Sequence, residues 1–397
     1  MQSLLPYMAG LIFFVCSPHN RLAASDEEIA HLKLRVQQLE AETKALSEQV
    51  ARLKGELTKV REWLVNPPKK NEPKPVGLLH MLDGHTNVVA SVAFFPTGDK
   101  VVTSGFDATC RIWDAKTGKE LGQRSTGQKE SQVGGPVAIS PDGKRIAARY
   151  FVADADTGKF LFGLEGHVAE ISRIRYDRDG KRLLTASYDG TIRIWEADTG
   201  KPVQTIKAHM GHKIPAGPRN GFGPPRGLDP PEFGGIEGRG VRDAVFSPDG
   251  KRIVSGGIDG MIRMWDVDTG KELWGWKQSQ DVLSVAFLPD GKRAVSGEAE
   301  GTIRIWDAAE GKELKKLTGH TGGVDALAVS PDGSLLVSAG ADKTVRVWDT
   351  DTGTELRCFR GHTGPVRAIA VSPDGKTALS GSEDKTARLW ALPAAER

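Results

Sequence analysis

The sequence predicts an all-β domain of repeated four-stranded units, preceded by a long α-helical coiled coil. Tryptophan ends a β-prone stretch in repeat after repeat, at intervals of 41 or 42 residues between Trp265 and Trp390. Between Ile29 and Leu64, apolar residues instead fall three and four apart, which is the period of a coiled-coil helix. The 47 glycines among 397 residues suit a chain with many tight turns.

We expect the first segment, residues 1–24, to be a signal peptide or a membrane anchor. Its apolar run, Leu4–Cys16, is too short for an ordinary membrane-spanning helix and has the length of a signal-peptide core. No Lys or Arg precedes the run, so an ordinary apolar N-terminus is the alternative. The rest of the chain is therefore expected outside the cytoplasm, exported or membrane-anchored, with a cytoplasmic location as the alternative.

Residues 25–66 form the predicted coiled-coil helix. Eleven a and d positions run from Ile29 to Leu64, and only Thr43 among them is not apolar. A lone helix would expose this seam, so residues 29–64 are predicted to make a homo-oligomer. Val and Ile at a with Leu at d favour a dimer, whereas 35–40 resembles a trimerisation motif, and both states stay open. Four prolines in residues 67–75 predict an extended, semi-rigid linker.

Residues 76–392 hold the repeats, and 393–397 form a short tail. An alternating strand is followed by Ser-Pro-Asp-Gly at 140–143, 247–250, 330–333 and 372–375. Asp-Thr-Gly follows the third strand at 156–158, 198–200, 268–270 and 351–353. These residues favour tight turns because proline presets φ and glycine accepts the left-handed conformation. Each sheet is apolar on both faces, so it must stack on its neighbours, and a closed ring removes exposed sheet edges.

Six repeats end in tryptophan, and a degenerate copy, 152–154, stands between the first two. The tryptophans are Trp113, Trp195, Trp265, Trp306, Trp348 and Trp390. On these residues, residues 76–392 resemble the WD40 repeat family, which implies a seven-bladed β-propeller. The chain ends soon after the strand of Trp390, so we expect 76–82 to supply the missing fourth strand and close the ring.

The resemblance also implies structural tetrads, in which a His, a Ser or Thr, a turn Asp and the Trp are joined by hydrogen bonds. Four complete sets are expected: His85, Thr103, Asp107, Trp113; His167, Thr185, Asp189, Trp195; His320, Ser338, Asp342, Trp348; and His362, Ser380, Asp384, Trp390. Because the set recurs, we interpret it as structural and not as a catalytic triad.

Three repeats are expected to lack the histidine. Counting back eleven residues from the second residue of the first turn gives Glu130, Glu237 and Gln278 in repeats two, four and five. The fourth repeat keeps Ser255, Asp259 and Trp265, and the fifth keeps Ser296 and Trp306. The second repeat has also lost about five residues, so a thinner blade is expected there.

Partner-binding candidates lie next to the turn aspartates. In the family, the residue before that Asp faces the same surface as the loop that leads into each first strand. Here Phe106, Tyr188 and Ile258 are large and apolar, and a Gly/Pro-rich insertion, 210–238, opens beside them with Phe222 and Phe233. The insertion is either a partner-binding loop or a tolerated insertion. His209 and His212 are interpreted as incidental, since no third metal ligand is evident.

Composition limits the function classes. The 54 basic and 51 acidic residues are too balanced for a dedicated nucleic-acid binder. Three cysteines without a CxxC motif give no disulfide framework or zinc ribbon. We expect no metal, cofactor or catalytic residue, and a non-enzymatic scaffold: a self-associating stalk that presents propellers to protein partners. The alternative is an enzyme or small-ligand sensor that uses the central channel.

Overall fold

The computed structural model describes residues 35–39, 43, 76–125, 134–209 and 240–394. The chain divides into two units, Met1–Pro73 and Lys74–Arg397. In the first unit, residues 35–39 and 43 are helical, and the Thr43 hydroxyl donates to the Leu39 carbonyl at 2.6 Å. The rest of the predicted coiled coil, the N-terminal segment and the linker lie outside the described residues.

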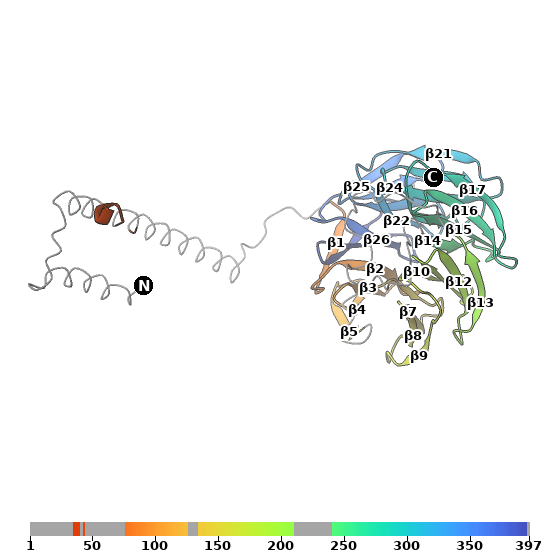
Figure 1. Ribbon diagram of the computed structural model, residues 1–397, viewed down its shortest axis with the longest axis horizontal. Coiled ribbons are helices and arrows are strands. Elements are labelled where there is room, and N and C mark those ends of the chain that lie inside the picture. The colour runs from red at the N-terminus through yellow and green to blue at the C-terminus, as the bar shows by residue number, and fades with distance from the viewer. Residues whose placement is uncertain (1–34, 40–42, 44–75, 126–133, 210–239, 395–397) are drawn as a thin grey trace, which may run out of the picture. The chain divides into compact units, whose positions relative to one another are not determined.

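The second unit is a ring of seven four-stranded antiparallel sheets, here called blades 1 to 7, with the first strand of each blade innermost (Figure 1). Blade 1 contains β2 (Val89–Phe94), β3 (Lys100–Gly105), β4 (Thr109–Asp114) and β5 (Glu120–Ser125). Blade 2 contains β6 (Val137–Ile139), β7 (Arg145–Ala148), β8 (Phe151–Asp154) and β9 (Phe160–Gly163). Blade 3 contains β10 (Ile171–Tyr176), β11 (Arg182–Ser187), β12 (Thr191–Glu196) and β13 (Pro202–Lys207).

The remaining blades repeat this order. Blade 4 contains β14 (Val241–Phe246), β15 (Arg252–Gly257), β16 (Met261–Asp266) and β17 (Glu272–Lys277). Blade 5 contains β18 (Val282–Phe287), β19 (Arg293–Glu298), β20 (Ile303–Asp307) and β21 (Glu313–Leu317). Blade 6 contains β22 (Val324–Val329), β23 (Leu335–Gly340), β24 (Val345–Asp349) and β25 (Glu355–Phe359). Blade 7 contains β26 (Val366–Val371), β27 (Thr377–Ser382), β28 (Thr386–Ala391) and β1 (Leu78–Asp83). The predicted seven blades are confirmed.

The two ends of the domain meet in blade 7. β1 pairs antiparallel with β28, from Leu78 opposite Trp390 to Asp83 opposite Thr386. Leu82 is fully buried, in a cluster that joins blades 7 and 1. The predicted closure of the ring by segment 76–82 is therefore confirmed, with the strand ending one residue later.

The turn after each first strand explains how the blades pack. In blade 6, the Ser330 hydroxyl donates to Asp332 Oδ1 at 2.6 Å and accepts from the Leu335 amide at 2.9 Å. Gly333 has φ +75°, and a Cβ built there would lie 3.2 Å from Pro289 of blade 5. Glycine is thus required both for the backbone angle and for the close approach of two blades. We call the face that carries these turns the bottom face, and the opposite face, with the tight Asp turns, the top face.

The core lies between blades. Each Trp packs against the preceding blade: the Trp390 ring stacks on Phe359 of blade 6 with centroids 5.1 Å apart, and Trp265 clusters with Ile192 and Ile194 of blade 3. Blade 2 has no Trp in the described residues, and its strands are three or four residues long. Its small size agrees with the expected thinner blade.

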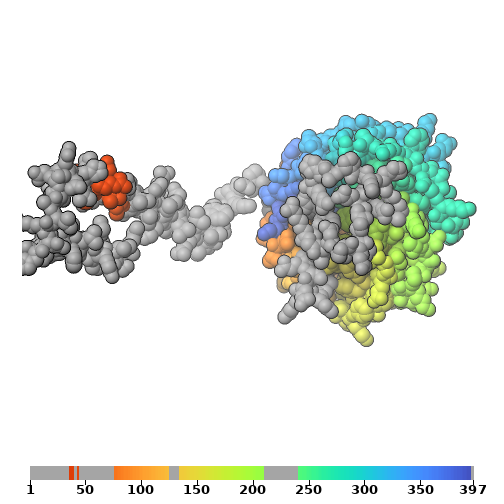
Figure 2. Space-filling view, viewed as in Figure 1, coloured from red at the N-terminus to blue at the C-terminus, as the bar shows by residue number. Residues whose placement is uncertain are grey.

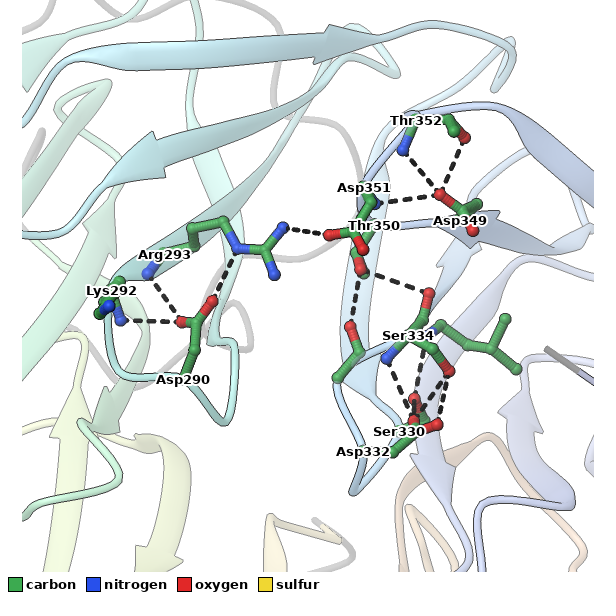
Figure 3. Close-up of polar contacts among 12 residues, drawn as sticks. Asp290, Lys292, Arg293, Ser330, Asp332, Ser334, Asp349, Thr350, Asp351 and Thr352 are labelled. Atoms are coloured by element: carbon green, nitrogen blue, oxygen red, sulfur yellow. Dashed lines mark hydrogen bonds and ion pairs between the residues drawn. The ribbon is translucent and has the colours of Figure 1, made fainter. Parts of the chain in front are cut away.

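Arginines that begin the second strands bind the next blade on the bottom face. Arg293 of blade 5 donates from Nη1 to Asp351 Oδ1 of blade 6 and from Nε to Asp290 Oδ2, both at 2.8 Å (Figure 3). Three other arginines also bond to the following blade: Arg145 to Asp198, Arg182 to the Gly250 carbonyl and Arg252 to the Gly291 carbonyl. Such exposed ion pairs add little individually, so the apolar contacts between blades dominate the stability of the ring.

Candidate interaction surface

Hydrogen bonds connect the top face to the core through the tetrads. In blade 6, the Trp348 indole donates to Ser338 Oγ at 2.8 Å, and Ser338 Oγ lies 2.7 Å from His320 Nε2. His320 Nδ1 lies 3.0 Å from Asp342 Oδ1. An indole N–H only donates, so the serine hydroxyl gives its own hydrogen to Nε2, which leaves Nδ1–H for the carboxylate. Every polar group in this series of hydrogen bonds, from Trp348 to Asp342, has a partner when the histidine is neutral.

The same contacts occur in the other complete sets. The His Nε2 to hydroxyl distance is 2.7 Å in each, for His85 with Thr103, His167 with Thr185 and His362 with Ser380. The Nδ1 atoms of these histidines lie 2.8–2.9 Å from Asp107, Asp189 and Asp384. The indoles donate to the same hydroxyls from Trp113, Trp195 and Trp390, at 2.8–2.9 Å.

The prediction that the tetrad of blade 4 lacks a histidine is wrong, because His209 takes that place. His209 Nε2 lies 2.8 Å from Ser255 Oγ, which also accepts from the Trp265 indole at 2.8 Å. His209 Nδ1 lies 2.8 Å from Asp259 Oδ1. His209 is fully buried. The prediction failed because the insertion follows this histidine, so counting back from the next turn reached Glu237, and His209 is structural and not incidental.

Blade 5 replaces the polar end of the tetrad with an ion pair. The Trp306 indole donates to Ser296 Oγ at 2.9 Å, as in the other blades. Glu298 is almost fully buried, and Arg304 Nε donates to its Oε1 at 2.6 Å. Gln278 is buried as well. The described residues of blade 5 thus hold a buried carboxylate, but bind it with an arginine in place of a histidine.

Burial and hydrogen bonding shift the pKa values of several tetrad side chains. Although burial alone would raise them, hydrogen bonds and the histidines lower the pKa values of Asp189 and Asp259 to about 2. Burial lowers the pKa values of His85, His209 and His362, despite the opposing effect of their aspartates. His85, His209 and His362 are therefore neutral near pH 7, and Asp259 beside His209 is ionised there.

On the top face, two of the predicted contact residues meet beside the end of the insertion. Tyr188 and Ile258 are half-buried, and a Cβ built on Gly240 would lie 3.2 Å from Tyr188 and 2.8 Å from Ile258. Phe106 is also half-buried, in the tight turn of blade 1. Phe222, Phe233 and His212 lie outside the described residues. Tyr188 and Ile258 therefore form one local group, which Phe106 does not join.

A charged cluster at the top of the channel was not predicted. Arg242 Nη1 donates to the Tyr188 hydroxyl at 3.2 Å, and its guanidinium lies 5.5 Å from the centroid of that ring. Arg367 Nη1 donates to Asp325 Oδ1 at 2.8 Å. Burial raises the pKa of Asp325, against the attraction of Arg367 and its neighbours. The sequence feature that could have revealed this cluster is a charged residue at the second position of a blade's first strand, as in Val241-Arg242 and Val366-Arg367.

One contact crosses the ring. Arg173 Nη2 of blade 3 donates to the Asp325 carbonyl of blade 6 at 3.1 Å, although two blades separate them on one side and three on the other. Nearby, Arg175 donates to both oxygens of the buried Asp243 at 3.1 Å, and the Val285 amide donates to Asp243 Oδ2. Blades 3 to 6 are thus joined through charged groups around the channel.

A family model described as WD domain, G-beta repeat (WD40) matches six segments of the chain: 77–114, 158–196, 233–266, 270–307, 311–349 and 353–391. The chain belongs to the WD40 repeat family. The blade between the first two matched segments, blade 2, is the one without a tryptophan.

Curated WD40 relatives match part of the chain. Nuclear distribution protein PAC1 of Arthroderma otae is 26% identical over 47% of this chain and 38% of its own length. Nuclear distribution protein nudF of Emericella nidulans is 28% identical over 61% of this chain and 48% of its own. Target of rapamycin complex subunit wat1 of Schizosaccharomyces pombe is 28% identical over 42% of this chain and 45% of its own length. The chain spans about half the length of these relatives or less.

The WD40 ring also holds a cavity of about 690 Å³ on its axis, towards the bottom face. Five prolines of the first turns line it: Pro141, Pro248, Pro289, Pro331 and Pro373. Asp177 is the one carboxylate in this described lining, and Arg182 Nε holds it at 2.8 Å. Within the described ranges, no group of three His, Cys, Asp or Glu side chains could hold a metal ion, and no helix is long and apolar enough to cross a membrane.

Proposed function

We propose that this WD40 protein is a non-enzymatic scaffold that binds a protein partner on the top face of its propeller. Family membership supports a role in protein interaction, and the name of the relative wat1 describes a subunit of a complex. The observation that carries the proposal is the group of Tyr188, Ile258 and Arg242 at the channel mouth. Tyrosine and arginine held in place by their neighbours are the residue types that dominate binding energy at interfaces.

The test is affinity capture with quantitative mass spectrometry, using the full chain and the double variant Tyr188→Ser/Ile258→Ser. We expect the captured partner to be lost while the thermal midpoint changes little. The matched control is Leu314→Ser/Val203→Ser on the rim, where both side chains are exposed, at 47% and 59%. Equal capture by the top-face variant and the wild type would refute the top-face site.

The proposal includes self-association through residues 29–64. Val36 and Leu39, at successive a and d positions, are 44% and 40% exposed in a single chain, which supports a seam that needs a partner helix. Sedimentation equilibrium should give two or three times the mass of one chain. Val36→Lys/Leu39→Lys should reduce this to a smaller species, whereas Gln37→Lys, on the outer face of the heptad, should not. A wild-type protein that sediments as one chain at all concentrations would refute the stalk.

An extracytoplasmic location is part of the same proposal, on the basis of the Leu4–Cys16 run. Cell fractionation of a tagged full chain should place the propeller outside the cytoplasm or on the membrane. Recovery in the cytoplasmic fraction would reject it. The alternative of catalysis or small-ligand sensing in the channel is less favoured, because Arg182 already binds the carboxylate Asp177 in the described lining.

A further inference from the structure

The outermost strands of most blades carry charged side chains at the rim of the ring. In four blades, an arginine of the third strand pairs with a glutamate at the start of the fourth. These pairs are Arg111–Glu120, Arg263–Glu272, Arg304–Glu313 and Arg346–Glu355, at 2.6–3.5 Å. Charged side chains on an edge strand discourage pairing with another chain, because pairing would bury them.

Blade 2 has aromatic residues where those blades have the ion pair. Phe151 of β8 and Phe160 of β9 take the two positions, with ring centroids 6.4 Å apart. Phe160 is nevertheless 61% exposed, and Leu161 beside it is 41% exposed. β9, which lies at the outer margin of the ring (Figure 1), is the one outermost strand without a charged residue within its bounds among the described blades. Figure 2 shows blade 2, in yellow, at the margin of the molecular surface.

Charges flank this apolar strand in a self-complementary order. The segment 159–165 reads Lys-Phe-Leu-Phe-Gly-Leu-Glu. In an antiparallel pair with itself, centred on Phe162, Lys159 of each copy lies opposite Glu165 of the other. Both side chains are exposed, and neither has an ion pair among the described residues. Opposite charges across an antiparallel pair are stabilising, and here the pair occurs twice.

The backbone around Gly163 agrees with this centre. The Leu164 amide donates to the Tyr150 carbonyl at 2.7 Å, so the polar groups of Leu164 face β8. Backbone groups alternate from Leu164 to Phe162, so those of Gly163 face the free edge. Beyond Phe162 the register with β8 shifts at a bulge, and the Lys159 carbonyl accepts from the Asp154 amide of β8 at 2.9 Å, so Lys159 contributes its side chain and not its backbone to the proposed pairing. With Phe162 at the centre, Gly163 of one copy lies opposite Leu161 of the other, and no side chain on Gly163 obstructs the approach.

We propose that β9 is a self-association surface, where two copies of this chain join their second blades into one continuous antiparallel sheet. A second copy is the occupant because the segment complements its own charges. The strand of blade 5 shows the contrast: in β21, Lys315 centred on itself would place like charges opposite each other. This contact is separate from the top face, from residues 29–64 and from the proposed function.

A charge exchange tests the pairing in the full chain. Sedimentation velocity over a range of concentrations at low salt should show the wild type associating beyond the species formed by residues 29–64. Lys159→Glu or Glu165→Lys should each weaken this step about tenfold or more, because two attractive pairs become repulsive. The double variant Lys159→Glu/Glu165→Lys restores the opposite charges and should recover the wild-type association.

Matched controls lie at equivalent positions on blade 4. Lys271→Glu makes the same charge change on an exposed side chain and should leave association unchanged. Leu161→Lys should abolish the step, whereas Leu273→Lys, at a rim position that is 51% exposed, should not. The pairing is overturned if the wild type shows no such step. It is equally overturned if Lys159→Glu associates like the wild type, or if the double exchange fails to rescue.

Discussion

His209 Nδ1 lies 2.8 Å from Asp259 Oδ1, which ties the last described residue before the insertion to the tight turn of blade 4. Arg263 Nη1 also donates to Asp259, at 2.7 Å, so the carboxylate is held from two sides. The contact fixes where the chain leaves blade 3, whatever the length of the insertion that follows.

We expect His209→Ala to lower the free energy of unfolding by about 1–3 kcal/mol, because Asp259 and Ser255 each lose a buried partner. Chemical denaturation measures this loss. The control is Lys201→Ala, which changes an exposed side chain in blade 3, just before β13. It should change stability by less than about 0.5 kcal/mol. An unchanged unfolding midpoint for His209→Ala would show that blade 4 does not depend on its tetrad.

Acidification should destabilise the propeller in two stages. The lowered pKa values of His85, His209 and His362 mean that the unfolded chain takes up protons first as pH falls below about 6.5, so stability declines there. Asp189 and Asp259, with pKa values of about 2, give a second decline as pH falls from about 4 towards 2. Urea midpoints at pH 7.5, 5.5 and 3.5 would measure both. Equal midpoints at pH 7.5 and 5.5 would contradict the first stage.

The closure of the ring can be tested within one strand. Leu82 of β1 is fully buried, so Leu82→Ala should cost about 2–5 kcal/mol. Leu79 of the same strand is 42% exposed, and Leu79→Ala should cost less than about 1 kcal/mol. Differential scanning calorimetry would compare the two. A similar small effect of both substitutions would mean that β1 contributes little to closing the ring.

Asp243 and Asp351 each join neighbouring blades, but they should differ in how much they contribute to the free energy of unfolding. Asp243 is buried and accepts from Arg175 and the Val285 amide, so Asp243→Ala should cost about 1–3 kcal/mol. Asp351 is 80% exposed, so Asp351→Ala should cost less than about 1 kcal/mol, although it pairs with Arg293 at 2.8 Å. Denaturation midpoints decide this comparison, and a larger loss for Asp351→Ala would reverse our ranking of the two contacts.

Features that repeat along the chain could be predicted from it. The tryptophan interval gave seven blades, and the missing strand after Trp390 gave the pairing of β1 with β28. His209 was missed because it was sought by counting back across an insertion. It lies 14 residues after Trp195, as His320 does after Trp306, so counting forward would have found it. Arg173 was missed for a different reason: it reaches blade 6, and a contact between distant repeats has no local pattern.

The bond from Arg173 to the Asp325 carbonyl changes how the ring can deform. In a propeller whose blades contact only their neighbours, blades 3 and 6 would be connected only through the blades between them. The direct bond between blades 3 and 6 opposes their separation across the channel, in addition to the interfaces between neighbouring blades.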